Sequence, residues 1–198
     1  MRRRKWLQAA LVIGVGSGAL AREDAGSVLT RPIPGSGERI PAVGLGTWLT
    51  FDVPIGDAPA LARRRAVVER FFAEGGRVID SSPMYGHAEA VLGELLPREP
   101  SRTFAVSKVW TPTALYGPTQ MRRSMALWRR TQMDVMLVHN LLAWRGHLQT
   151  LRRWQSEGRV RYVAVTHYTP SAFAELEAVL RPEKLDFVQL DYAATDRA

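Results

Sequence analysis

Two kinds of segment alternate along the chain. Short apolar runs, such as RVIDSS (77–82) and VRYVAVTHY (160–168), are separated by longer stretches in which apolar and charged positions follow a helical period, as in 60–75. Continuous apolar runs are typical of strands that are buried on both faces, and such strands occur in parallel sheets with helical crossovers. The pattern therefore predicts an α/β fold with a parallel sheet.

The pattern predicts six strands and five intervening helices. The strands are expected at 43–48, 77–82, 103–110, 134–140, 160–168 and 187–192. The helices are expected at 60–75, 87–96, 118–132, 147–158 and 171–181, and Ser171 is expected to cap the last one. A small hairpin is predicted between residues 27 and 41, because two β-prone pieces flank Gly35-Ser36-Gly37.

Two architectures fit this order of elements, an open doubly wound sheet and a (β/α) barrel. A dinucleotide-binding doubly wound fold should carry G-x-G-x-x-G between a strand and a helix. Here Gly44-Leu45-Gly46 is followed by Thr47 and Trp48, with no third glycine and no helix directly after it. The barrel is therefore favoured, and it predicts chemistry at the C-terminal ends of several strands.

Polar residues stand at or just past the ends of most predicted strands. Taken singly, each has a simple structural explanation, because an aspartate at a strand end is usually a helix cap and a histidine in an apolar run is usually a hydrogen-bonded core residue. A parallel barrel brings adjacent strand ends to one rim, so these side chains are expected to gather. They are Thr47, Asp80, Lys108, His139, Asn140, Thr166, His167 and Gln189.

Lys108 indicates chemistry most directly. The chain has 24 arginines and only three lysines, and Lys108 lies in a strand that is expected to be buried. A buried ammonium needs a carboxylate partner, and Asp80 ends the neighbouring strand. A purely structural Lys–Asp pair is the alternative.

Tyr85 lies in the turn five residues after Asp80. A phenol has a pKa of about 10, and a nearby ammonium is expected to lower it. Tyr85 is then a candidate proton donor to a developing alkoxide, and His139 is a candidate hydrogen-bond donor to the same oxygen. None of these side chains supplies a hydride, so a reduced nicotinamide cofactor would be needed.

From about Leu29 to Tyr192 the chain resembles the aldo-keto reductase family. The resemblance is carried by the hairpin, GLGTW, the SSPMYG turn that follows Asp80, the Ser-Lys strand, DVMLVHN and GRVRYVAVTH. It implies a (β/α)₈ TIM-barrel fold and NAD(P)H-dependent reduction of aldehydes or ketones to alcohols. By this resemblance Tyr85 is the general acid, Lys108 lowers its pKa, Asp80 anchors Lys108, and His139 orients the substrate.

The resemblance also implies residues for the cofactor, which is NADP(H) or else NAD(H), with no metal. Thr47 and Asp80 would lie near the nicotinamide ribose, and Gln189 would bind the carboxamide. Thr166 and His167 stand where many family members have Ser-Asn, which also contacts the carboxamide. Three tryptophans that follow strand ends are expected to line an apolar substrate pocket. These are Trp48, Trp110 and Trp144.

The family barrel has eight strands, and six are predicted here. The seventh and eighth would hold the aromatic residue that stacks on nicotinamide and the basic residues that bind the 2′-phosphate. Residues 22–198 are therefore expected to form an incomplete barrel that binds NADPH weakly. A catalytically silent barrel fragment that only binds a ligand or a partner is the alternative function. An acid–base enzyme such as an isomerase is disfavoured, because no phosphate-binding loop or metal cluster is seen in the sequence.

The N-terminus predicts export. Residues 1–21 combine a basic start, a short apolar core and the ending Ala19-Leu20-Ala21, which is typical of a signal peptide. Arg3-Arg4-Lys5-Trp6-Leu7-Gln8 resembles the twin-arginine motif. We therefore expect cleavage before Arg22, a periplasmic location and no stable membrane span afterwards. A cytoplasmic location or an uncleaved N-terminal membrane anchor is the alternative.

Composition excludes several classes of site. With no cysteine, the chain has no disulfide, thiolate zinc site, iron–sulfur cluster or cysteine nucleophile. The net charge is +8, but four basic residues lie at positions 2–5, and the other 23 face 19 acidic residues. That charge is scattered along the predicted helices, which argues against a nucleic-acid partner. By the resemblance to aldo-keto reductases, the expected partner is a small carbonyl compound.

Overall fold

The computed structural model describes residues 28–192. A hairpin of β1 (Thr30–Pro32) and β2 (Arg39–Pro41) comes first. Then follow β3 (Leu45–Gly46), α1 (Ala58–Ala73), β4 (Val78–Asp80), α2 (Ala88–Leu95), β5 (Phe104–Val109), α3 (Gly117–Leu127), β6 (Met133–His139), α4 (Trp144–Ser156), β7 (Val160–His167), α5 (Phe173–Leu180) and β8 (Phe187–Leu190). The predicted signal peptide at 1–21 lies outside the described residues.

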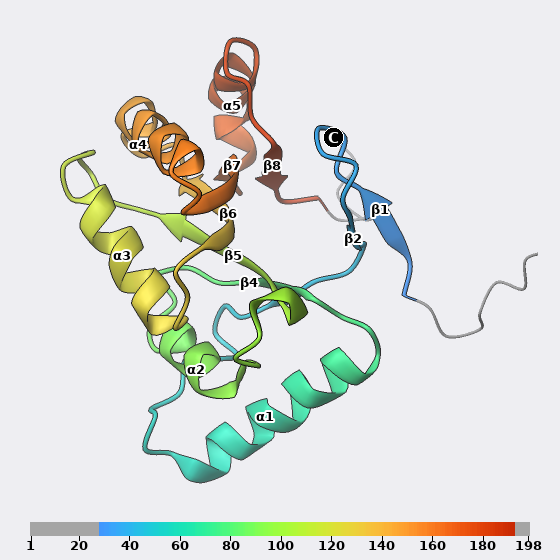
Figure 1. Ribbon diagram of the computed structural model, residues 1–198. Coiled ribbons are helices and arrows are strands. Elements are labelled where there is room, and N and C mark those ends of the chain that lie inside the picture. Colours follow the sequence, from blue (N-terminus) through green and yellow to red (C-terminus); the bar gives the residue numbers. More distant parts are fainter. Residues whose placement is uncertain (1–27, 193–198) are drawn as a thin grey trace, which may run out of the picture.

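Six strands form one parallel sheet in the order β3-β4-β5-β6-β7-β8, and β1 and β2 form a separate antiparallel pair. A helix connects each strand to the next, and the helices cover the outer side of the curved sheet (Figure 1). The predicted six strands, five helices and N-terminal hairpin are confirmed, and the fold matches an incomplete TIM barrel. Within the described residues no helix has the length and apolar character needed to cross a membrane.

Several predicted helix boundaries differ from the structure by a few residues, and two of the differences have a clear physical reason. Ser171 does not cap α5, because a 3₁₀ turn over Pro170–Ala172 precedes it and Ala172 takes the cap position. The sequence predicts that the third helix runs to 132, but α3 ends at Leu127, and Arg129 adopts a left-handed φ of 56°. A left-handed residue cannot continue a right-handed helix.

The alternation of side chains along each strand builds two cores. Outward-facing residues such as Ile79, Ala105 and Val163 pack against the helices in the larger hydrophobic cluster. Inward-facing residues form a second cluster inside the curve of the sheet, which the hairpin residue Ile33 joins. The strand members of this inner cluster are Phe104, Val106, Val135, Leu137, Tyr162 and Ala164.

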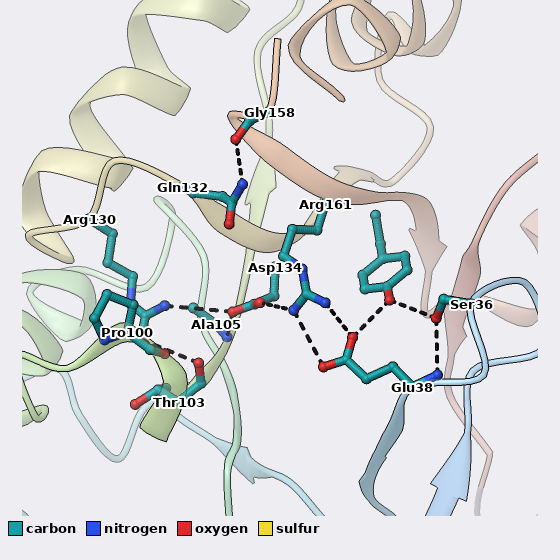
Figure 2. Close-up of polar contacts among 11 residues, drawn as sticks. Ser36, Glu38, Pro100, Thr103, Ala105, Arg130, Gln132, Asp134, Gly158 and Arg161 are labelled. Carbon is teal, nitrogen blue, oxygen red and sulfur yellow. Dashed lines mark hydrogen bonds and ion pairs between the residues drawn. The ribbon is translucent and has the colours of Figure 1, made fainter. Parts of the chain in front are cut away.

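A polar network ties the hairpin to the N-terminal end of the sheet (Figure 2). Arg161 on β7 forms ion pairs with Glu38 next to β2 and with Asp134 on β6, the latter at 2.6 Å. The hydroxyl of Tyr162 donates to Glu38 at 2.8 Å and lies 2.8 Å from the hydroxyl of Ser36. Polar contacts at this end of a barrel serve stability, and the other end is left for the site.

Candidate active site

At the C-terminal ends of the strands, the inward-facing side chains are polar. On β5 the inward positions run Phe104, Val106 and then Lys108, because side chains alternate with a period of two. The strand register aligns His139 with Thr166, and Thr166 with Gln189. Neighbouring strands lie about 4.8 Å apart, so these residues form one row above the inner core.

Lys108 is buried beside this row and is fully paired. Its Nζ donates to both carboxylate oxygens of Asp80 at 2.7 Å and to the carbonyl oxygen of Ser81 at 2.8 Å. The Lys108 side chain is 2% exposed and that of Asp80 22%. Burial lowers the pKa of Lys108, and the negative charge of Asp80 opposes this shift. The predicted partnership of Lys108 with Asp80 therefore has direct geometric support.

The turn after β4 places Tyr85 beside this pair. Tyr85 N–H donates to the Ser82 carbonyl at 3.0 Å, and Gly86 follows with a φ of +57°. A Cβ on Gly86 would lie 2.2 Å from Asp52, so both the backbone conformation and the close approach require glycine. Nζ of Lys108 lies 5.2 Å from the centroid of the Tyr85 ring.

The pKa of Tyr85 differs from the expectation. Burial of the half-buried phenol, followed by the negative charge of Asp80, raises its pKa to about 12. The lowering expected from Lys108 is outweighed, because burial and the negative charge of Asp80 both favour the protonated phenol. Tyr85 therefore stays protonated at neutral pH.

His139 ends β6 and is 7% exposed. Burial lowers its pKa to about 4, and the positive charges of Lys108 and His167 act in the same direction. The imidazole is therefore neutral at pH 7 and carries one N–H. Its buried Nδ1 has no hydrogen-bond partner among the described residues. The next residue, Asn140, adopts a left-handed φ of 52° and ends the strand.

A cavity of about 460 Å³ opens above this row. Its wall is mainly apolar and aromatic, with a few convergent polar groups, as is usual for a small-molecule site. It is lined by Trp48, Met84, Tyr85, Lys108, His139, Thr166, Tyr168, Gln189, Leu190 and Asp191.

Several residues proposed from the sequence lie elsewhere. Thr47 is fully buried, and its hydroxyl lies 2.9 Å from the Asp80 carbonyl and from the Ser81 hydroxyl, so it supports the strand ends from below. His167 stacks on Tyr168 and accepts from the Thr169 N–H at 3.1 Å. Trp110 and Trp144 do not line the cavity. Gln120 bonds the backbone of Trp110, and Trp144 packs against the outer core.

Four residues that line the cavity, and one residue that accepts a hydrogen bond from Lys108, were not predicted from the sequence. Met84 and Tyr168 lie on loops, and Leu190 and Asp191 lie at the end of β8 and just past it. Ser81 acts through its backbone carbonyl, which residue type does not reveal. Asp191 and Tyr168 each follow a polar strand-end residue closely, so extending the search past each strand end would have found them.

The residues present fit one end of a nicotinamide dinucleotide. Gln189 and Thr166 place amide and hydroxyl groups at the cavity, which suits a carboxamide. Lys108 is the only cation among the lining residues, and it is paired with Asp80. The described cavity therefore offers no free positive charge to a phosphate. The described residues contain no cluster of three or more side chains able to hold a metal ion.

The model of the aldo/keto reductase family matches residues 42–197. Solved structures of aldo-keto reductases share the fold. One from Klebsiella pneumoniae in complex with NADP and acetate is 24% identical, with a TM-score of 0.63 over 74% of this chain. The holo form of one from Bacillus halodurans is 15% identical, with a TM-score of 0.69 over 84% of this chain.

A thermostable aldo-keto reductase in complex with the inhibitor epalrestat is 23% identical, with a TM-score of 0.71 over 86% of this chain. The chain spans 52% of the Klebsiella enzyme, 58% of the Bacillus enzyme and 65% of the thermostable enzyme. No curated protein matches the chain in sequence.

Proposed function

The chain belongs to the aldo/keto reductase family, and we propose that it reduces aldehydes or ketones to alcohols with NADPH, with Tyr85 as the proton donor. The family and the similar structures indicate an oxidoreductase. One observation carries the assignment of roles. Lys108, paired on both oxygens of Asp80, lies against the Tyr85 ring at the same cavity that holds the neutral His139.

Each side chain has a defined part in this reaction. A bound reduced nicotinamide would supply the hydride that reaches the carbonyl carbon. Tyr85 then gives its hydroxyl proton to the carbonyl oxygen, which becomes the alcohol. An alkoxide is a much stronger base than a phenolate with a pKa of about 12, so this proton transfer is favourable. The neutral His139 donates a hydrogen bond that orients the carbonyl oxygen.

The Lys108–Asp80 pair acts when proton transfer leaves a negative charge on Tyr85. When Tyr85 has given up its proton, the ammonium of Lys108 lies close to the phenolate that results and stabilises it. The cavity wall of Trp48, Met84 and Leu190 favours a substrate with an apolar or aromatic body. Gln189 and Thr166 are the proposed contacts to the carboxamide of the cofactor.

Aldehyde-dependent oxidation of NADPH, followed by absorbance with the cofactor in large excess, tests the proposal. Tyr85→Phe should reduce the rate by roughly 10²-fold or more, because the phenol proton is lost. Tyr168→Phe is the matched control, since it removes a hydroxyl from the same cavity and should keep most of the rate. Equal rates for wild type and Tyr85→Phe would refute the assignment, and an inactive wild type would support a silent barrel fragment.

A further inference from the structure

A buried carboxylate lies close to the proposed site but on the other face of the sheet. Glu89 is in the first turn of α2 and is 2% exposed. It accepts hydrogen bonds from the hydroxyls of Ser107 at 2.6 Å and Ser124 at 2.8 Å, and from the indole N–H of Trp128 at 3.1 Å. Three donors directed at two carboxylate oxygens are the arrangement that satisfies an ionised group.

These contacts join the two elements that carry the proposed acid and its cation. Glu89 follows Tyr85 by four residues in the chain, and the Ala88 N–H donates to the Tyr85 carbonyl at 3.1 Å. On the other side, Ser107 immediately precedes Lys108 on β5. The bond from Ser107 to Glu89 therefore fixes the Tyr85 turn against the Lys108 strand. Ser124 on α3 and Trp128, the residue that follows α3, also bond to Glu89 and hold it against this helix.

The negative charge of Glu89 also affects the pKa of Lys108. Burial lowers the pKa of Lys108, and both Asp80 and Glu89 oppose this shift with their negative charges. Burial raises the pKa of Glu89, while its three hydrogen bonds and the charge of Lys108 oppose that shift. The other titratable groups near the ammonium are Tyr85, over whose ring it lies, and His139, whose pKa it lowers.

We propose that Glu89 is a positioning residue for carbonyl reduction: it fixes Tyr85 against Lys108 and serves as a second counter-ion that keeps the Lys108 ammonium charged. This role rests on the proposed function. It assigns a task to a buried acid that does not line the cavity. A packing role alone would not need three hydrogen-bond donors directed at a carboxylate in the layer between sheet and helices.

The test is NMR titration of the full chain labelled with ¹³C at Cε of lysine. The chain has only Lys5, Lys108 and Lys184, so Lys108→Arg identifies the resonance of interest. In Glu89→Gln the pKa of Lys108 should fall by roughly one unit, because one of its two counter-ions is gone. Glu94→Gln is the matched control, because Glu94 lies on the same helix, is partly exposed and pairs with Arg129. It should leave the Lys108 pKa unchanged.

An unchanged Lys108 pKa in Glu89→Gln, or equal shifts in both variants, would overturn the proposal. Should Glu89→Gln fail to fold, Ser107→Ala tests the same contact. Loss of the 2.6 Å hydrogen bond favours the protonated form of Glu89, so the Lys108 pKa should fall in this variant too. No shift there would equally contradict the counter-ion role. The titration does not require an active enzyme, so its result does not depend on whether the chain reduces carbonyl compounds. If the chain does, Glu89→Gln should lower kcat more than it changes KM.

Discussion

His139 combines a nearly buried ring with a pKa that burial lowers to about 4. In the unfolded chain an imidazole has a pKa of about 6.5, so between pH 6.5 and 4 the unfolded state binds more protons than the folded state. The stability contributed by the neutral ring is therefore complete above pH 6.5. It is lost as the pH falls towards 4, with a slope of up to about 1.4 kcal/mol per pH unit.

Urea unfolding of wild type and His139→Gln at several pH values between 7 and 4 measures this effect. The free energy of unfolding of the wild type should fall more steeply with decreasing pH than that of His139→Gln, which has no titrating ring. Parallel pH dependences would mean that the folded protein accepts a proton at His139 without penalty.

The residues of the candidate site differ in how well the sequence predicts them. Asp80, Lys108, His139 and Gln189 could be predicted because each lies at or next to the end of a parallel strand, and a parallel sheet brings such ends to one rim. The direction of the Tyr85 pKa shift could not, because it depends first on how deeply the phenol is buried and then on its distance from Asp80. Residue type and spacing do not contain that distance.

Among the elements, the strands and helices were predictable and the loops were not. Apolar runs and helical periods located all six strands of the parallel sheet. Trp110 and Trp144 follow strand ends as Trp48 does, yet only Trp48 lines the cavity. The direction in which a loop carries a side chain depends on tertiary contacts, such as the bonds between Gln120 and the Trp110 backbone.

The attachment of the hairpin to the sheet can be tested through Arg161. This side chain bridges Glu38 and Asp134 and is 34% exposed (Figure 2). Arg161→Met should lower the free energy of unfolding by about 1–3 kcal/mol, because two carboxylates lose a charged donor. Amide hydrogen exchange in β1 and β2 should speed up in the same variant.

The control for this experiment is Arg181→Met. Arg181 pairs with Glu177 on the exposed surface of α5, with side chains 74% and 63% exposed. Exposed pairs of this kind contribute about 0–1 kcal/mol. If both substitutions have the same small effect, the Arg161 network does not hold the hairpin to the sheet.

At the scale of the whole molecule, the described part of the chain forms six parallel strands. The strands at its two edges, β3 and β8, each pair with one neighbour there, and Val188 and Leu190 on β8 are 41% and 42% exposed. The cavity opens beside β8, and its lining residues include the amide of Gln189 and the hydroxyl of Thr166 but no free cation for phosphates.

The purified chain is therefore expected to bind NADPH weakly, with a Kd above the micromolar range, and to distinguish little between NADPH and NADH. A phosphate needs a charged donor for tight binding, and the described cavity lacks a free one. Titration by cofactor fluorescence measures both affinities. A micromolar Kd for NADPH, or a strong preference over NADH, would mean that residues outside the described cavity bind the phosphates.

The most direct test of carbonyl reduction at this site is transfer of the label from NADPH dideuterated at C4. With an aromatic aldehyde and the cofactor in large excess, mass spectrometry of the alcohol should find one deuterium per molecule for wild type and for Tyr168→Phe. Tyr85→Phe should yield almost none of this product. Unlabelled alcohol from the wild type, or equal yields of labelled alcohol from Tyr85→Phe and wild type, would contradict the account.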